Sequence, residues 1–220
     1  MRRINSIAGD SEDGFGLTEY TALGVGSPHH APVTAGAGIT VTSQVVSLDD
    51  CILRSTGSGY YSHSATYAGL VAALAAASSG DSVELPPGTY VGDITVPTNV
   101  VLKSRGGNVT IQGALTLNSY SEIVDIVVSL TESSASAIYG IDNAGDSPAY
   151  LRHCTVSVSN TGAGDAVGVY ASGAGGLYSM DCFIGATAAS GAGYGASKGA
   201  GDIFVRDGEL AGGTAPVGET

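Results

Sequence analysis

The sequence predicts an all-β protein, a right-handed parallel β-helix (a solenoid) with a short N-terminal capping helix and an extended N-terminal arm. Three observations lead to this prediction. Short apolar-alternating runs between Gly80 and Gly107 are separated by Pro, Gly and Asn, and no Asn-Gly or Asp-Gly pair joins them into hairpins. Two sequence markers recur in step in the C-terminal half. One stretch of the chain shows the apolar spacing of an amphipathic helix.

The first marker is the fourth position of the runs "IVDIVVSL", "LRHCTVSV", "SMDCFIGA" and "VRDGELAG". These positions are Ile126, Cys154, Cys182 and Gly208, with spacings of 28, 28 and 26. The second marker is a run that ends in glycine, at Gly145, Gly173 and Gly199, with spacings of 28 and 26. A strand this short cannot bury its apolar face alone, so equivalent strands are expected to stack in parallel about 4.8 Å apart.

Stacking in this register places Ile126, Cys154, Cys182 and Gly208 in one core column. The next inward column contains Val128, Val156, Ile184 and Leu210. The short runs of the opening stretch then become the first coils, and each finds its partner one coil away.

The chain is expected to divide into three parts. Residues 1–32 lack periodicity and form an extended N-terminal arm in this interpretation. Residues 33–63 form a connector with two short strands, which need a partner to be stable. Residues 64–220 form the helix-capped β-helix.

The capping helix is predicted over residues 66–79. Its apolar stripe recurs at helical spacing and consists of Tyr67, Leu70, Val71 and Leu74. Ser64 or Thr66 is the expected N-cap, and Gly80 is expected to end the helix.

Composition and charge exclude several classes of function. The net charge of −12 repels polyanions, so neither nucleic-acid binding nor an anionic membrane surface is expected. The run "YAGLVAALAAASS" is too short to span a bilayer. The N-terminus lacks a secretory apolar stretch, so we expect a chain made in a cytoplasm. Cys51, Cys154 and Cys182 lack metal-type spacing and are expected to be reduced and buried, without metal or cofactor.

A surface ladder is predicted one residue before the core column, at Asp125, His153, Asp181 and Asp207. In this register the four side chains point outward at a corner, about 5 Å apart. Carboxylates at this spacing can share a proton, hold a cation or cleave a glycosidic bond. The alternative is that strand corners favour Asp, Asn and His for turn geometry, with Arg152 and Arg206 neutralising the acids. We favour turn geometry and assign no catalytic residue.

Tyrosines offer a second hypothesis for a surface site, because their rings stack on sugars and the chain has no Trp. The candidates are scattered along the chain, and tyrosine is also an ordinary residue of sheet surfaces. They are Tyr60, Tyr61, Tyr90, Tyr120, Tyr139, Tyr150, Tyr170, Tyr178 and Tyr194.

The stretch "SATYAGLVAALAAASSGDSVELPPGTYVGDITVPTNVVLKSRGG" resembles the start of pectin-lyase-like β-helix proteins. In that family a short helix caps the first coil, and a Gly-Asp, a strand and a Pro-Gly-Thr-Tyr turn follow it. "LRHCTVSV" and "MDCFIG" resemble the family's coil pattern, so the likeness covers about residues 64–220. It implies the fold, but the family includes lyases, hydrolases, viral spikes and adhesins. Separately, "VTAGAGITVTSQVVSL" resembles connector segments of phage tail fibres.

The resemblance also implies which catalytic features to look for. The family's lyases commonly use a Lys or Arg base near a calcium-binding acid cluster, and this chain has only Lys103 and Lys198 as lysines. Paired aspartates mark the family's hydrolases, and the one Asp-Asp pair here, Asp49-Asp50, precedes the helix. The sequence therefore favours a protein without catalytic activity over an enzyme.

We therefore expect a structural virion component, a phage-type tail fibre, spike or capsid-attached fibre that contacts a host-surface glycan. Expected partners are two further copies in a homotrimer, through residues 33–50, and other virion proteins, through residues 1–32. The alternative is a polysaccharide lyase or glycoside hydrolase, a depolymerase on the same β-helix. A third interpretation is an adhesin or filament subunit.

Overall fold

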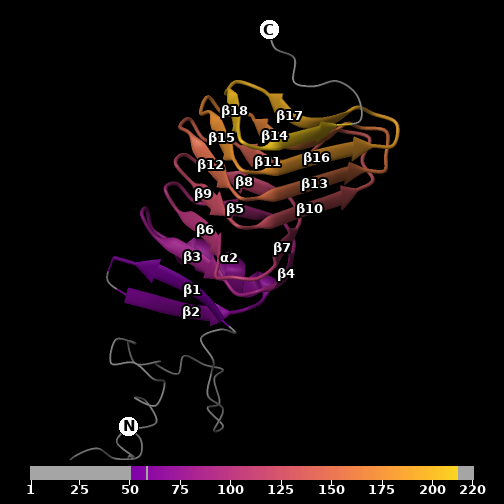
Figure 1. Ribbon diagram of the computed structural model, residues 1–220. Coiled ribbons are helices and arrows are strands. Elements are labelled where there is room, and N and C mark those ends of the chain that lie inside the picture. Colours follow the sequence, from indigo (N-terminus) through magenta and orange to yellow (C-terminus); the bar gives the residue numbers. More distant parts are fainter. Residues whose placement is uncertain (1–50, 58, 213–220) are drawn as a thin grey trace, which may run out of the picture. The chain divides into compact units, whose positions relative to one another are not determined.

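The computed structural model describes residues 51–57 and 59–212, which form three β-sheets and one short helix (Figure 1). In spatial order, the first sheet contains β18 (Ile203–Arg206), β15 (Leu177–Met180), β12 (Ala149–Arg152), β9 (Glu122–Val124), β6 (Val101–Ser104), β3 (Ser82–Leu85), β1 (Cys51–Thr56) and β2 (Gly59–Ser64). The second contains β19 (Glu209–Gly212), β16 (Phe183–Ala188), β13 (Thr155–Asn160), β10 (Val127–Glu132), β7 (Val109–Gln112) and β4 (Gly88–Val91). The third contains β17 (Gly193–Lys198), β14 (Ala166–Ala171), β11 (Ile138–Asn143), β8 (Leu115–Leu117) and β5 (Ile94–Val96).

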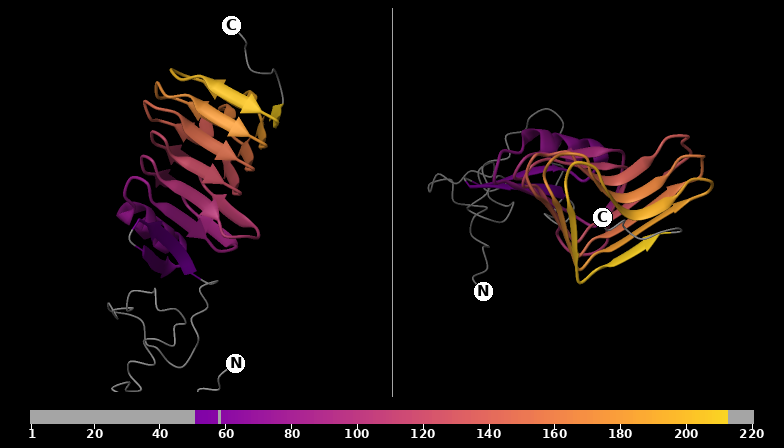
Figure 2. Two further views of the ribbon diagram at one scale, coloured as in Figure 1. Left: turned by 60° about the vertical axis from the view of Figure 1, so that its left-hand side comes forward. Right: turned by 90° about the horizontal axis from the view of Figure 1, so that it is seen from above.

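From β3 onward the chain visits the three sheets in turn, and each strand pairs in parallel with the strand three positions later in the sequence. The views of Figure 2 show these turns stacked on one another. The runs "VEL" and "VLK" of the opening stretch are such partners, because Val83 of β3 pairs with Leu102 of β6. The predicted all-β class with parallel sheets is thus confirmed, and the arrangement is that of a β-solenoid.

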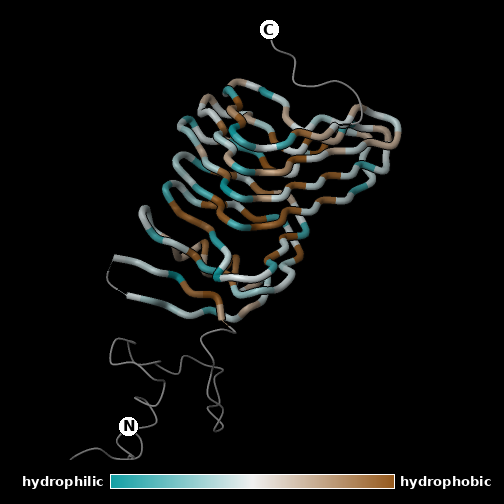
Figure 3. Tube along the Cα trace, in the orientation of Figure 1, coloured by the Kyte–Doolittle hydropathy of each residue, from teal (hydrophilic) through white to brown (hydrophobic). Residues whose placement is uncertain are grey.

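Apolar columns fill the interior. Val156 pairs with Val128 in the coil before it and with Ile184 in the coil after it, and all three are fully buried. Hydrophobic and hydrophilic residues alternate along the strands in Figure 3, which is the pattern of a sheet with one buried face. Each such Val or Ile contributes about 1.5–3 kcal/mol through burial, so the columns are the main source of stability.

The coils become longer part-way along the chain. Ser82 pairs with Val101 in the next coil, whereas Glu122 pairs with Tyr150, which is considerably further along the sequence. Much of the growth lies between the second and third sheets, where the chain passes from β7 to β8 through Gly113 and Ala114 but from β10 to β11 through residues 133–137. A step in coil size therefore lies between β7 and β10.

Two buried asparagines hold the longer turns. The side-chain nitrogen of Asn143 donates to the carbonyls of Gly175 and Gly176, each at 3.0 Å, and its side-chain oxygen accepts the Gly145 N–H. Asn160 accepts the N–H groups of Ser134 and Gly162 in the same way. Side-chain amides thus provide hydrogen-bond partners for the backbone N–H and C=O groups of these turns, where strand pairing stops.

Helix α2 (Tyr67–Ala76) lies against β1, β2, β4 and β5, inside the range predicted for the capping helix. Thr66 is its N-cap, because the Gly69 N–H donates to the Thr66 hydroxyl at 3.1 Å. The predicted stripe is wrong at Val71, which is 42% exposed. The buried face is instead Gly69, Leu70, Ala73 and Leu74.

The predicted end of this helix is also wrong. The helix stops at Ala77, whose extended backbone directs the chain toward β3, and not at Gly80. Gly80 has a φ of +91° in the turn that follows, and its N–H donates to the carbonyl of Asn99 in the next coil. Glycine is favoured there because few residues adopt a positive φ.

Two strands that the sequence did not predict form a hairpin at one edge of the first sheet. Strands β1 and β2 pair antiparallel, and β1 pairs antiparallel with β3. Arg54 of β1 binds Asp81 at 2.9 Å, and its guanidinium lies 4.4 Å from the ring centre of Tyr61. The predicted arm 1–32 and the connector strands within 33–50 lie outside the described residues, so both remain predictions.

The register predicted for the last coil needs one correction. The spacing of 26 between Gly173 and Gly199 predicts that Val167 pairs with Gly193. In the structure Val167 pairs with Tyr194, one position further on. The turn between β16 and β17 is one residue shorter than the turn between β13 and β14. The sequence separation between Val167 and its partner is therefore one residue less than in the preceding coil, and not two residues less. The first sheet does keep the predicted spacing, because Leu177 pairs with Ile203.

Candidate functional site

The predicted ladder lies at the corners between the first and second sheets, where a left-handed residue joins each pair of strands. Asp125, His153, Asp181 and Asp207 have φ angles of 56°, 53°, 52° and 52°. Asp and His adopt this conformation more often than most residues do. The backbone alone thus accounts for the residue types, which agrees with the turn-geometry interpretation.

The ladder side chains also meet one another. The two ring nitrogens of His153 lie 3.3 Å from Asp125 and 3.4 Å from Asp181. All three side chains are more than half exposed, so solvent weakens these contacts. Of the two arginines expected to neutralise the acids, Arg206 pairs with Asp207 at 3.1 Å, but Arg152 binds Glu122 instead.

The core column places two thiols in contact. Ile126, Cys154 and Cys182 are buried, whereas Gly208 lies exposed in the last described coil. The Cys154 N–H donates to the Cys182 sulfur at 3.3 Å, and the Cys154 thiol donates to the Arg152 carbonyl at 3.2 Å. The hydrogen bond with Cys182 and burial raise the pKa of Cys154 well above its ordinary value. No disulfide joins the two residues.

Most of the candidate tyrosines are engaged within the fold. Tyr139 stacks on Tyr170 with ring centres 4.5 Å apart. Tyr178 stacks between Tyr150 and Phe204, at 5.6 Å and 4.6 Å. Tyr90 is buried, while Tyr60 and Tyr120 are exposed. Because the stacked rings cover one another's faces, they are poor platforms for a sugar.

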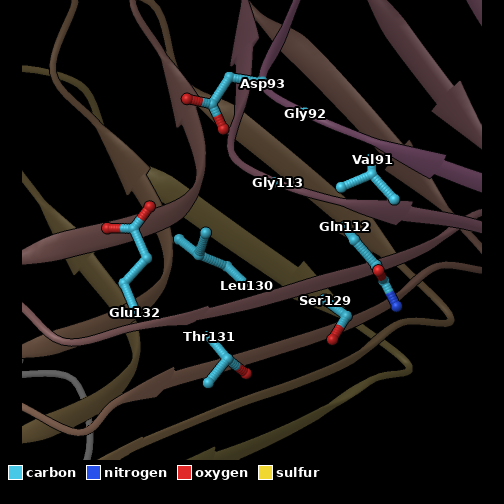
Figure 4. Close-up of a pocket in the computed structure, with 9 residues that line it drawn as sticks. All are labelled: Val91, Gly92, Asp93, Gln112, Gly113, Ser129, Leu130, Thr131 and Glu132. Carbon is cyan, nitrogen blue, oxygen red and sulfur yellow. The ribbon is translucent and has the colours of Figure 1, made fainter. Parts of the chain in front are cut away.

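A pocket that the sequence did not indicate opens where the coil size changes (Figure 4). Its volume is about 400 Å³. Figure 4 shows the carboxylates of Asp93 and Glu132 on one side and Val91, Gln112 and Ser129 on the other. The full lining is Val91, Gly92, Asp93, Gln112, Gly113, Ser129, Leu130, Thr131 and Glu132.

The described part of the chain shows neither a metal centre nor a membrane span. No three His, Cys, Asp or Glu side chains gather there as metal ligands. Within the same residues, no helix has the length and apolar character needed to cross a bilayer.

Comparisons with protein-family models, with curated proteins and with solved structures gave no match for this chain. The likeness to pectin-lyase-like proteins therefore rests on the sequence stretches quoted above, together with a parallel-sheet fold that is compatible with it.

Proposed function

We propose that this chain is a structural component of a virus-type particle, a fibre or spike built on a right-handed parallel β-helix. The observation that carries the proposal is that the repeated outward side chains bind their equivalents in neighbouring coils. The ladder contact of His153 and the stack of Tyr150 on its equivalent Tyr178 are examples. Such contacts join successive coils and make a solenoid more rigid. In a catalytic site, by contrast, several side chains converge on one reacting atom.

In this proposal residues 1–32 anchor the chain to other particle proteins, residues 33–50 join it into a homotrimer, and the β-helix projects toward a host-surface glycan. The particle is assembled in the host cytoplasm. The connector supports the trimer, because its two short strands are too small to be stable alone.

The test is the mass of the purified full chain in solution, with electron microscopy of the same sample. We expect trimeric rods, and a variant that lacks residues 1–50 is expected to have the mass of a monomer. A full chain that is already monomeric at micromolar concentration contradicts the trimer.

A polysaccharide depolymerase is the second candidate, and the acid-lined pocket at Asp93 and Glu132 is the observation that favours it. Incubation of the wild type with polysaccharides distinguishes the two. Release of reducing ends or unsaturated products that Asp93→Asn, Glu132→Gln, Asp181→Asn or Asp207→Asn abolishes supports the enzyme. The structural proposal predicts no such release.

A further inference from the structure

The step between β7 and β10 leaves part of a strand edge open. β10 pairs with β7 over Val127–Ser129 only, because β7 ends at Gln112. The Ser129 carbonyl still accepts the Gly113 N–H at 3.1 Å. Alternate residues of a parallel strand direct their N–H and C=O to the same side. The N–H and C=O of Thr131 therefore face the step, beyond the last residue of β7.

This open edge coincides with the pocket. The walls offer hydroxyls from Ser129 and Thr131, the Gln112 amide and the carboxylates of Asp93 and Glu132. One Asp93 oxygen already accepts the Ala114 N–H at 2.8 Å, which fixes the carboxylate and leaves its second oxygen for a ligand. The exposed Val91 adds an apolar contact surface. Closely spaced hydrogen-bonding groups beside a small apolar patch suit a hydroxyl-rich ligand.

The charge of the pocket narrows the ligand class. Neither Asp93 nor Glu132 has an ion-pair partner among the described residues, where Lys103, Arg152 and Lys198 pair with other acids. No basic residue lines the pocket. An anionic ligand would thus approach two uncompensated carboxylates, whereas hydroxyl or ammonium groups would donate hydrogen bonds to them.

We propose that this pocket binds a mono- or disaccharide and selects neutral and amino sugars over uronic and sialic acids. The inference rests on the proposed glycan contact and names its sugar class. A volume of about 400 Å³ lies within the range of small-ligand sites and accommodates a unit of this size.

The experiment measures binding to the full chain by saturation-transfer NMR and calorimetry, with N-acetylglucosamine, glucosamine, galacturonate and N-acetylneuraminate as probes. We expect the first two to bind in the millimolar range and the two acids to bind about tenfold more weakly or worse. Glu132→Gln removes one charge and keeps the shape, so it should narrow the difference between galacturonate and N-acetylglucosamine. Asp93→Asn should act in the same direction.

The matched control is Glu209→Gln, which makes the same change on β19 of the same sheet, outside the pocket. It should leave the discrimination unchanged, and circular dichroism checks that each variant is folded. Equal binding of galacturonate and N-acetylglucosamine overturns the proposal, as does discrimination that survives both pocket variants. Absence of binding by all four sugars overturns it too, including the case in which an extended basic peptide binds the Thr131 edge instead.

The experiments distinguish failure of the structural function from failure of the saccharide pocket. Trimeric rods that bind no sugar would leave the structural function in place and remove only the saccharide pocket. A monomer that discriminates among the sugars would do the reverse.

Discussion

Gly175 lies so close to the backbone carbonyl of Ser147 in the preceding coil that a Cβ at position 175 would overlap the carbonyl oxygen. The Gly175 N–H donates to the Gly145 carbonyl at 3.0 Å, so the two turns stack backbone on backbone. The same contact recurs one coil later, where a Cβ at Gly201 would overlap the carbonyl of Gly175. The 34 glycines of the chain include many with this packing role.

Gly175→Ala should therefore lower the free energy of unfolding by about 2–3 kcal/mol, because the turn must move away from its neighbour. Gly57→Ala is the matched control, since a Cβ at position 57 would meet no atom within 4 Å. Urea denaturation followed by circular dichroism compares the two variants. Equal stabilities would show that the turns are not closely stacked.

Asn143→Ala should destabilise the protein by about 2–4 kcal/mol, because it leaves the Gly145 N–H and the carbonyls of Gly175 and Gly176 without their partner in a buried turn. Asn108→Ala changes an exposed asparagine and should stay within about 0.5 kcal/mol of the wild type. Thermal unfolding of both variants gives the comparison. A loss at Asn143 no larger than at Asn108 would contradict the buried network.

The inner columns were predictable because the sequence repeat keeps a constant period wherever the coil length stays constant, as it does from Val128 to Val156 and Ile184. Stacked coils need equivalent residues at equivalent positions, so the period and the register carry the same information. The prediction fails by one residue at Val167, where a turn becomes shorter and the period no longer equals the register.

The pocket and the hairpin were not predictable in this way. The pocket arises where β10 outgrows β7, which is a difference between two coils and leaves no motif in either. The β1–β2 hairpin is antiparallel and has no equivalent in the repeat. The ladder residues were identified from the repeat, but their left-handed backbone, which explains their residue types, became apparent only from the structure.

Two substitutions of His153 test whether the ladder affects stability through its backbone conformation or through its charges. Asn accepts the φ of 53° but lacks the two ring nitrogens with which His153 contacts Asp125 and Asp181. Because the ladder is exposed, His153→Asn should cost less than about 1 kcal/mol. His153→Val should cost about 1–3 kcal/mol, since a β-branched residue is strained in this conformation. Denaturant titrations at low and high salt measure both. A large, salt-dependent loss in His153→Asn would instead assign the ladder an electrostatic role.

The last prediction concerns alkaline pH. The pKa of Cys154 in the folded state is raised, so the folded protein holds this proton more tightly than the unfolded chain, whose thiol titrates near 8.5. The stability from this group is fully present below pH of about 8.5 and is lost as the pH rises toward the folded pKa, by up to about 1.4 kcal/mol per pH unit.

Cys154→Ala should remove this contribution to the pH dependence of the unfolding free energy between pH 8 and 10, measured by guanidinium denaturation under reducing conditions. Val156→Ala, a fully buried change in the neighbouring column, should lower stability by a similar amount at every pH and keep the wild-type slope. Identical slopes in both variants would show that Cys154 does not titrate as its burial requires.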